Sequence, residues 1–245
     1  MIKNEVIEFA KAIVQPKWQN LPNILAFTTL AQLNGKKLSF SGNSKDSIEA
    51  RKNIQKLLQP CAPIKWLKQV HGNRILRLPE ENNIEEADGA VTNKKYIPCV
   101  ILTADCLPVI FATADGKAVG AAHAGWRGLV SGVIPNTVRA FNDNPSAIYV
   151  WLGPAIGYLS FEVGYEVYDR FIKSDTNNKK AFKSGRQDKY YANLYELAHM
   201  QLIKAGVNKN NITSNEYDTF TNPLFHSARR NGAASGRMAT IVMIT

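Results

Sequence analysis

Three short segments carry polar, reactive side chains where the surrounding sequence is apolar and strand-like. They are residues 68–73 (Lys-Gln-Val-His-Gly-Asn), 103–108 (Thr-Ala-Asp-Cys-Leu-Pro) and 121–128 (Ala-Ala-His-Ala-Gly-Trp-Arg-Gly). Imidazole and thiolate side chains act as general bases, nucleophiles and metal ligands. His71, Cys106 and His123 are therefore the first candidates for chemistry.

The chain positions of Cys106 and His123 do not show whether they meet. Cys106 ends an apolar run just before Pro108, and His123 ends the next predicted strand before a glycine-flanked turn. Glycine there lets the backbone pass close to a ligand. A predicted hairpin joins the two strands, and we expect it to put the two ends on opposite sides of the ribbon unless one strand overshoots. Spacing alone favours two satisfied core residues over a Cys–His pair.

Hydrophobic periodicity predicts the elements that must position these residues. Helices are expected over residues 46–58, 131–141, 166–173 and 193–205, and strands over 96–103, 108–113, 118–123, 147–152 and 239–244. Residues 114–117 carry a hairpin turn signal, and residues 174–190 resemble one exposed loop. Strands that lie partly in hairpins and partly between helices indicate an α+β fold with a mixed sheet. Without repeats or linkers, residues 1–245 are expected to form a single domain.

The composition is that of a globular protein. The chain has 245 residues, 45% of them hydrophobic and 20% charged, which is enough to bury a sizeable core. The three cysteines lack a framework spacing, which argues against a disulfide scaffold. No signal-like run follows the N-terminus and no stretch approaches about 18 apolar residues, so a cytoplasmic location without membrane partners is expected.

The net charge of +10 suggests two classes of partner, nucleic acids and anionic small molecules such as phosphate. The densest basic set lacks the aromatic motifs that stack on RNA bases, so we interpret it as a solvated face. Its members are Lys179, Lys180, Lys183, Arg186 and Lys189. A nucleic-acid-binding module is therefore the weaker alternative to an enzyme.

Five phrases in order carry a family resemblance. They are Gln-Val-His-Gly, Thr-Ala-Asp-Cys-Leu-Pro-Val, Ala-Ala-His-Ala-Gly-Trp-Arg-Gly, Gly-Pro-Ala-Ile-Gly followed by Phe-Glu-Val-Gly, and a tail from Arg-Arg-Asn-Gly to Ser-Gly-Arg-Met-Ala. From about Pro16 to Ile244 the chain resembles the YfiH-like family, also named the laccase-domain or multicopper polyphenol oxidase family. The resemblance implies two mixed β-sheets packed as a sandwich with helices outside. The deamidase domain of cytotoxic necrotizing toxins belongs to the same fold group.

The resemblance also implies one zinc ion per chain, bound by His71, Cys106 and His123. Three nitrogen and sulfur ligands leave a fourth tetrahedral position open, as in catalytic zinc sites. The copper chemistry in the family's name fits less well, because a multicopper cluster needs many imidazoles. The chain has four histidines, and His199 lies in a predicted helix as a structural residue.

The activities implied by the resemblance are phosphorolysis and deamination of purine nucleosides. Phosphorolysis of adenosine, inosine or methylthioadenosine gives the free base and ribose 1-phosphate, and hydrolysis converts adenosine to inosine. A metal that lowers the pKa of water to about 7 suits the hydrolysis. Phosphorolysis needs cations for phosphate, and guanidinium groups match its oxygens. Arg229 and Arg230 are the main candidates, with Arg127 and Lys68 as lesser ones.

Three further residues are candidates near the substrate. Asp88 and Asp105 are possible acid–base groups or carboxylates that orient a ligand, and for Asp105 orientation is favoured. Asp88 is expected to contact the substrate. His226 replaces an aromatic residue of the family phrase, and it is a candidate substrate contact or acid–base group, although a packing role is the stronger alternative.

The chain departs from the family phrases at Leu30, Asp218, His226 and Ala228, which changes the expected substrate-facing wall. Two other enzyme activities remain as alternatives. One is a cysteine hydrolase or deamidase with Cys106 as nucleophile and His123 as base, which has no need of His71. The other is an enzyme that edits a peptidoglycan precursor.

Overall fold

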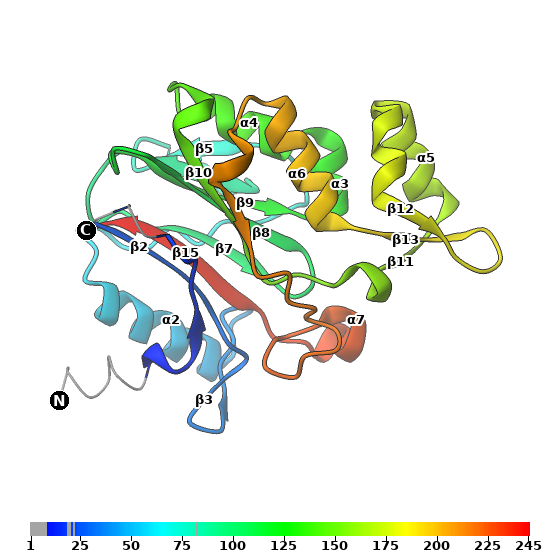
Figure 1. The fold of residues 1–245 in the computed structure, drawn as a ribbon. Coiled ribbons are helices and arrows are strands. Elements are labelled where there is room, and N and C mark those ends of the chain that lie inside the picture. The colour runs from blue at the N-terminus through cyan, green and yellow to red at the C-terminus, as the bar shows by residue number, and fades with distance from the viewer. Residues whose placement is uncertain (1–8, 19–20, 22, 82) are drawn as a thin grey trace.

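Two β-sheets lie face to face in the computed structural model, which describes residues 9–18, 21, 23–81 and 83–245 (Figure 1). The four-stranded sheet has the order β1 (Ile13–Val14), β2 (Ile24–Thr29), β15 (Met238–Ile244), β7 (Cys99–Thr103). The six-stranded sheet has the order β14 (Ile212–Ser214), β10 (Ile148–Leu152), β8 (Leu107–Thr113), β9 (Val119–Ala124), β6 (Gly89–Thr92), β5 (Ile75–Arg77). The first sheet is antiparallel throughout. The second is mixed, because β14 and β5 add parallel pairs at its edges.

Alternation along the strands explains why the sheets stack. In β8, Leu107, Val109 and Phe111 face one core cluster, whereas Ile110 and Ala112 face another, as expected for side chains that alternate across a strand. The second cluster joins the inner faces of the two sheets. Both faces of each sheet are therefore buried, which accounts for the long apolar runs in the sequence.

Helices cover the outer face of each sheet, as Figure 1 shows. Helices α3 (Trp126–Ser131), α4 (Val133–Ala140) and α6 (Leu194–Lys204) pack on the six-stranded sheet. Helix α2 (Lys45–Leu58) packs on the four-stranded sheet through Ala50, Ile54 and Leu58. The α+β sandwich with outer helices is thus confirmed, except that one of the two sheets is purely antiparallel rather than mixed.

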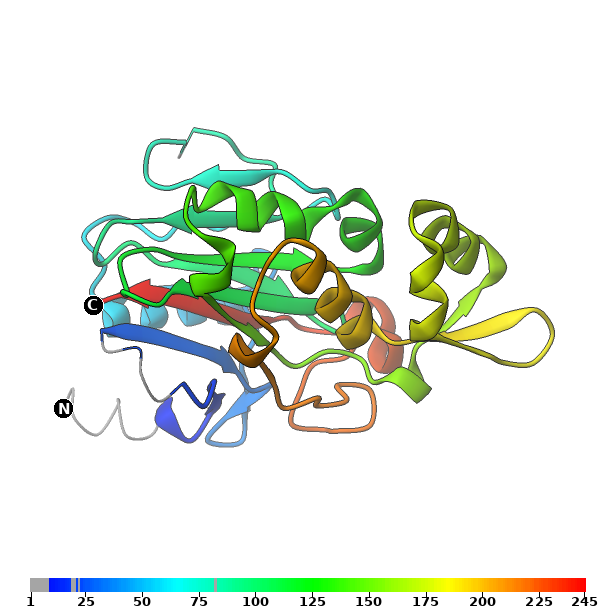
Figure 2. The ribbon, with the colours of Figure 1, turned by 45° about the horizontal axis from the view of Figure 1, so that its top comes forward.

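The segment expected to be one loop, residues 174–190, is ordered. It contains a 3₁₀ helix, Thr176–Ala181, and the strands β12 (Phe182–Ser184) and β13 (Lys189–Ala192). These strands form a small sheet with β11 (Glu162–Gly164), covered by α5 (Tyr165–Ser174), and Figure 2 shows their hairpin projecting from the body. The prediction of a loop was wrong because such short strands carry almost no periodic signal. The remaining elements are β3 (Gln32–Leu33), β4 (Lys36–Lys37) and α7 (Ala228–Asn231).

Two other local predictions also need correction. The helix expected over residues 131–141 is α4, but it begins only after Gly132, whose φ of +86° ends a preceding helix, α3, that was not predicted. Glycine adopts this left-handed conformation without steric cost. The prediction that the hairpin β8–β9 separates Cys106 from His123 was also wrong. In a hairpin, the start of the first strand lies beside the end of the second strand, away from the turn. Leu107 pairs with Ala124 and Pro108 with His123, so Cys106 and His123 lie at the same end of the ribbon.

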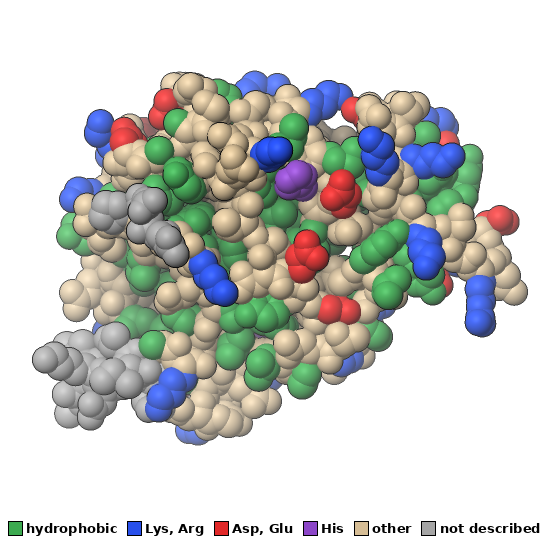
Figure 3. Space-filling view, in the orientation of Figure 1, with side chains coloured by type: hydrophobic (Ala, Val, Ile, Leu, Met, Phe, Trp, Pro, Cys, Tyr) green, Lys and Arg blue, Asp and Glu red, His purple; other side chains and the backbone are tan. Residues whose placement is uncertain are grey.

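Lys and Arg side chains are scattered over the face in Figure 3 rather than gathered in one patch. No helix in the described part of the chain is long and apolar enough to cross a membrane.

Candidate metal centre

Three segments that are distant in sequence bring His71, Cys106 and His123 together. His71 lies in the loop before β5, Cys106 lies in the turn between β7 and β8, and His123 lies near the end of β9. One ligand atom from each residue lies within 4.8 Å of the other two. Cys106 Sγ is 3.9 Å from His71 Nε2, and the two imidazole rings meet edge to face with centroids 4.7 Å apart. The sequence-predicted ligand set therefore converges on one point.

The three side chains differ in their access to solvent. His123 is buried, Cys106 is half-buried and His71 is exposed. The group therefore has a closed inner side and an open outer side. A centre with three protein ligands and one accessible side has the arrangement that catalytic zinc sites share.

Asp88 organises two of the three candidate ligands from beneath. Its Oδ1 accepts hydrogen bonds from His123 Nδ1, at 2.8 Å, and from the backbone N–H of His71, at 2.9 Å. Its Oδ2 accepts from the backbone N–H groups of Gly72, at 2.6 Å, and Val70, at 3.2 Å. Proton donation from Nδ1 leaves Nε2 of His123 free to bind a metal.

Asp88 was predicted to contact the substrate or to orient a ligand, and its geometry favours the second role. The residue has no exposed surface, and both of its oxygens are used within the protein. It also supports His71, whose φ of +60° is an uncommon backbone conformation for a residue other than glycine. Asp88 is a positioning residue.

The electrostatics favour an ionised pair at the inner side of the group. Burial opposes ionisation of Cys106, but His123 and His71 outweigh it and lower the pKa of the thiol. Burial likewise opposes protonation of His123, but Cys106 and Asp88 raise the pKa of its imidazole. The pKa of Asp88 is lowered despite burial, because His123 and backbone N–H groups stabilise the carboxylate. A thiolate is the form of cysteine that binds metals.

The donor set fits a metal ion of zinc type. Imidazole nitrogen and thiolate sulfur are ligands that zinc commonly takes, with bonds of about 2.0–2.3 Å. Donors at such distances around a tetrahedral ion are about 3.5 Å apart, so the present group needs to close by only about 1 Å. A cation at this point would also neutralise the thiolate.

A second buried aspartate, Asp105, precedes Cys106 and has φ +89°. Its carboxylate accepts hydrogen bonds from Thr219 Oγ1 at 2.6 Å, Ser227 Oγ at 3.1 Å and the backbone N–H of Arg229 at 2.6 Å. These partners include none of the three candidate ligands, so the role of Asp105 as a carboxylate that orients a ligand stays a prediction. The carboxylate fixes the chain around residues 219–229 beside the candidate metal centre.

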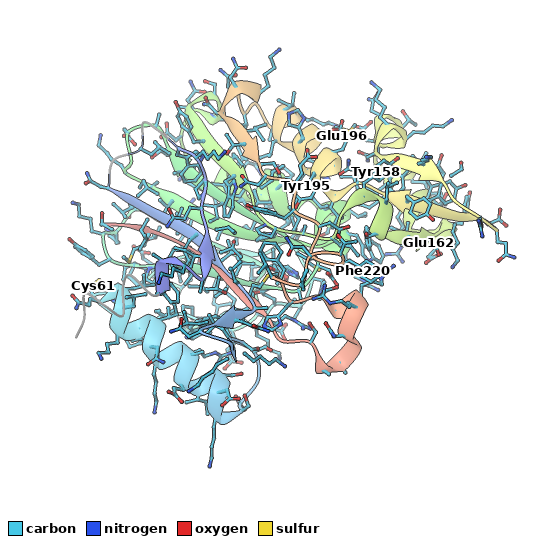
Figure 4. The ribbon with its side chains drawn as sticks, turned by 60° about the horizontal axis from the view of Figure 1, so that its bottom comes forward. Cys61, Tyr158, Glu162, Tyr195, Glu196 and Phe220 are labelled. Atoms are coloured by element: carbon cyan, nitrogen blue, oxygen red, sulfur yellow. The ribbon has the colours of Figure 1, made fainter. Side chains whose placement is uncertain are left out.

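The paired arginines have different environments. Arg230 donates to the backbone carbonyls of Thr219 at 2.8 Å, Phe220 at 2.7 Å and Phe225 at 2.6 Å. The guanidinium of Arg229 donates to the carbonyl of Glu162, at 3.2 Å, and lies 5.5 Å from the Phe161 ring centroid. Figure 4 labels Glu162, whose carbonyl accepts from Arg229, and Phe220, whose carbonyl accepts from Arg230. The catalytic role of Arg230 stays a prediction, and its guanidinium already donates to three backbone carbonyls that close a loop.

Known proteins with a similar sequence and fold identify the family. Residues 31–245 match the family described as multi-copper polyphenol oxidoreductase laccase. The chain belongs to this laccase family. It is 37% identical to a purine nucleoside phosphorylase of Haemophilus influenzae, over 94% of this chain and 98% of that protein. It is 38% identical to the Escherichia coli purine nucleoside phosphorylase YfiH, over 95% and 98%.

Solved structures agree with the sequence comparison. A crystal structure of a Neisseria meningitidis protein superposes with a TM-score of 0.88 at 32% identity, covering 95% of this chain and 99% of that one. The YfiH protein of Bacillus licheniformis gives a TM-score of 0.85 at 25% identity, covering 96% and 97%. The family resemblance predicted from the sequence phrases is confirmed.

Two departures from the laccase-family phrases have structural partners. Asp218 accepts from the backbone N–H groups of Gly157 and Phe220, both at 2.9 Å, and from Ser160 Oγ at 2.5 Å. His226 is buried and bonds through Nε2 to the carbonyl of Leu38 at 2.8 Å. This contact agrees with a packing role for His226, and the predicted substrate contact stays a prediction. Leu30 and Ala228 add no chemistry of their own.

The lesser cationic candidates lie at the surface. Lys68 forms an exposed ion pair with Glu86, 2.8 Å from Nζ to Oε1. Arg127 lies over the ring of Trp126, with its Cζ 4.3 Å from the centroid. Sequence reasoning missed Arg170 of α5, which approaches the same ring at 5.9 Å. Nothing in the helical pattern around Arg170 separates it from an ordinary solvated arginine.

Proposed function

We propose that the chain is a zinc-dependent purine nucleoside phosphorylase with His71, Cys106 and His123 as its metal ligands. The convergence of these three donors above Asp88 is the observation that carries the proposal. The relatives named purine nucleoside phosphorylase, which match nearly the whole chain, support the substrate class. The substrates would be a purine nucleoside and phosphate.

The residues of the chain divide the work of the reaction. Asp88 holds His123 in one tautomer and fixes the His71 loop by its backbone, so the donor atoms are oriented before substrate binds. Phosphate then attacks C1′ of the ribose, the C1′–N bond breaks, and the departing purine takes up a proton. Arg229 remains a candidate cation at the outer side, since its guanidinium has a single carbonyl partner among the residues that the structure describes.

A zinc ion at this centre would supply Lewis-acid chemistry and would lower the pKa of water to about 7. The same centre would therefore also suit hydrolytic deamination of adenosine to inosine, and we propose this as a second reaction. Adenosine, inosine and methylthioadenosine are the proposed phosphorolysis substrates.

The test is a nucleoside panel with the purified protein, with and without phosphate. Free base and ribose 1-phosphate are expected only when phosphate is present, and inosine is expected from adenosine without it. About one zinc per chain is expected, with most of it lost in His71→Ala, Cys106→Ala and His123→Ala. A zinc-loaded, folded protein that turns over no purine nucleoside contradicts the proposal and favours a peptidoglycan precursor as substrate.

A cysteine hydrolase is the second candidate, because Cys106 and His123 stabilise each other's charged forms. This dyad needs only two side chains, whereas His71 approaches Cys106 Sγ to 3.9 Å. Full zinc retention in His71→Ala would favour the dyad over the three-ligand centre.

A further inference from the structure

Two arginines from different helices approach one indole ring. The Cζ atom of Arg127, in α3, lies 4.3 Å from the centroid of the Trp126 ring, and that of Arg170, in α5, lies 5.9 Å from it. The two guanidinium groups are therefore at most about 10 Å apart, the sum of these distances. Stacking on an aromatic face fixes the plane of a guanidinium and orients its N–H groups.

Neither arginine has an anionic partner within the described part of the chain. Helix α3 has no acidic residue in its first turn. In α5, Asp169 pairs with Lys173 at 2.7 Å, and the carboxylate of Glu166 folds back toward the backbone at the start of its own helix. Two like charges held this close repel each other unless an anion lies between them. The arrangement therefore suits an anion from outside the chain.

The first turn of α3 packs directly on the candidate metal centre. A Cβ atom added to Gly125, which precedes this helix, would lie 3.0 Å from Cys106 Sγ and 3.3 Å from His71 Cδ2. A Cβ atom at Gly128 would lie 3.1 Å from the carbonyl oxygens of both Gly72 and His123. These distances are shorter than those that a side-chain Cβ normally keeps from its neighbours. Glycine at both positions therefore allows α3 to approach the metal ligands closely. Arg127 therefore lies in the helix that packs against the metal ligands, two residues after Gly125.

The geometry points to Arg127 and Arg170 as a binding site for a phosphate dianion beside the metal centre. The inference rests on the proposed function only for the role of that anion as co-substrate. A guanidinium pair offers several N–H donors in fixed planes, which match the oxygens of phosphate. Arg127 was a lesser candidate for phosphate in the sequence, whereas the two main candidates suit this task less, because Arg230 donates to carbonyls and Arg229 already donates to one.

Direct binding of inorganic phosphate to the zinc-loaded protein, without nucleoside, is the first test. Isothermal titration should show phosphate binding that weakens by about tenfold in Arg127→Gln and in Arg170→Gln, the loss expected for one charge-assisted hydrogen bond. The double variant should bind no measurable phosphate. Arg186→Gln, at the exposed tip of the β12–β13 hairpin, removes the same charge and should bind as the wild type does. Unchanged binding in the double variant overturns the inference.

Two further arms sharpen the result. Lysine at both positions keeps the charges but loses the planar stacked groups, so it should restore binding only in part. The lysine variant also serves as the test protein if a glutamine variant fails to fold. Adenosine 5′-monophosphate, titrated alone, separates free phosphate from a phosphate ester. Arginine-dependent binding of the monophosphate without binding of inorganic phosphate would overturn the co-substrate role.

Kinetics separate this inference from the proposed function. The KM for phosphate should rise by about tenfold in each single variant, with the KM for nucleoside unchanged. Phosphorolysis with a normal phosphate KM in the double variant overturns the inference and leaves the function in place. If phosphate binding depends on the two arginines but the protein catalyses no phosphorolysis, the binding site is supported and the proposed function is overturned.

Discussion

Two buried aspartates flank the candidate metal centre and do different work. Asp88 bonds to a ligand side chain, His123, and to the backbone of the loop that carries His71. Asp105 adjoins Cys106 in sequence, yet its oxygens bond only to the chain around residues 219–229. The comparison teaches that proximity to a ligand in sequence does not reveal which carboxylate positions the metal. Asp88 positions two of the candidate metal ligands, whereas Asp105 holds residues 219–229 in place beside them.

The largest effect is expected from Asp88→Asn. Loss of the orienting carboxylate should weaken zinc binding by about 10–100-fold, the range seen when such partners are removed. Four donors also lose their charged acceptor, so the free energy of unfolding should fall by about 3 kcal/mol. Zinc titration and urea unfolding measure the two effects. Asp115→Asn, in the exposed β8–β9 turn, is the matched control, and equal zinc affinity in both variants would refute the role given to Asp88.

Asp105→Asn should show that Asp105 and Asp88 have different roles. The variant should keep its zinc, because no ligand bonds to the Asp105 carboxylate. Its turnover of nucleoside should fall and its free energy of unfolding should drop by about 2 kcal/mol, as hydrogen bonds to a charged group are lost. Metal analysis beside steady-state kinetics provides the check. Zinc loss as large as that of Asp88→Asn would break the distinction.

A smaller effect should distinguish the adjacent arginines within the Asp105 region. Arg230→Ala strands three backbone carbonyls and should lower the free energy of unfolding by about 1–3 kcal/mol. Arg229→Ala should change it by less than about 0.5 kcal/mol, as for a surface substitution. Chemical unfolding of both variants tests this difference. If the two lose stability equally, Arg230 does not close the loop.

The smallest effect concerns pH. Burial lowers the pKa of His226, so the unfolded chain binds its proton more readily than the folded protein does. Stability from this residue is therefore present above the unfolded pKa of about 6.5 and declines as pH falls toward the lower folded pKa. His226→Gln should flatten that decline. Thermal melts between about pH 5 and 7.5 are the measurement, and identical slopes in both proteins would exclude a contribution from His226.

The sequence predicted the long elements and the three candidate ligands, because each leaves a strong local signal. Buried strands such as β15 give continuous apolar runs, and the ligands lie in long family phrases. The partners of Asp88 and Arg230 could not be predicted, since they are backbone groups brought together only by the fold. Arg170 was missed for the same reason. Its partner is a ring on another helix, and no pattern within α5 records that contact.

The central place of β15 in the four-stranded sheet has a consequence for the order of synthesis. This strand pairs with both β2 and β7, and Thr240 Oγ1 meets Thr28 Oγ1 at 2.8 Å across a sequence separation of 212 residues. Nothing can bridge β2 to β7 until β15 leaves the ribosome. Until then β2 and β7 each keep an unpaired edge, and such edges expose a growing chain to aggregation. The four-stranded sheet is therefore expected to be completed only after β15 has been synthesised, long after β2.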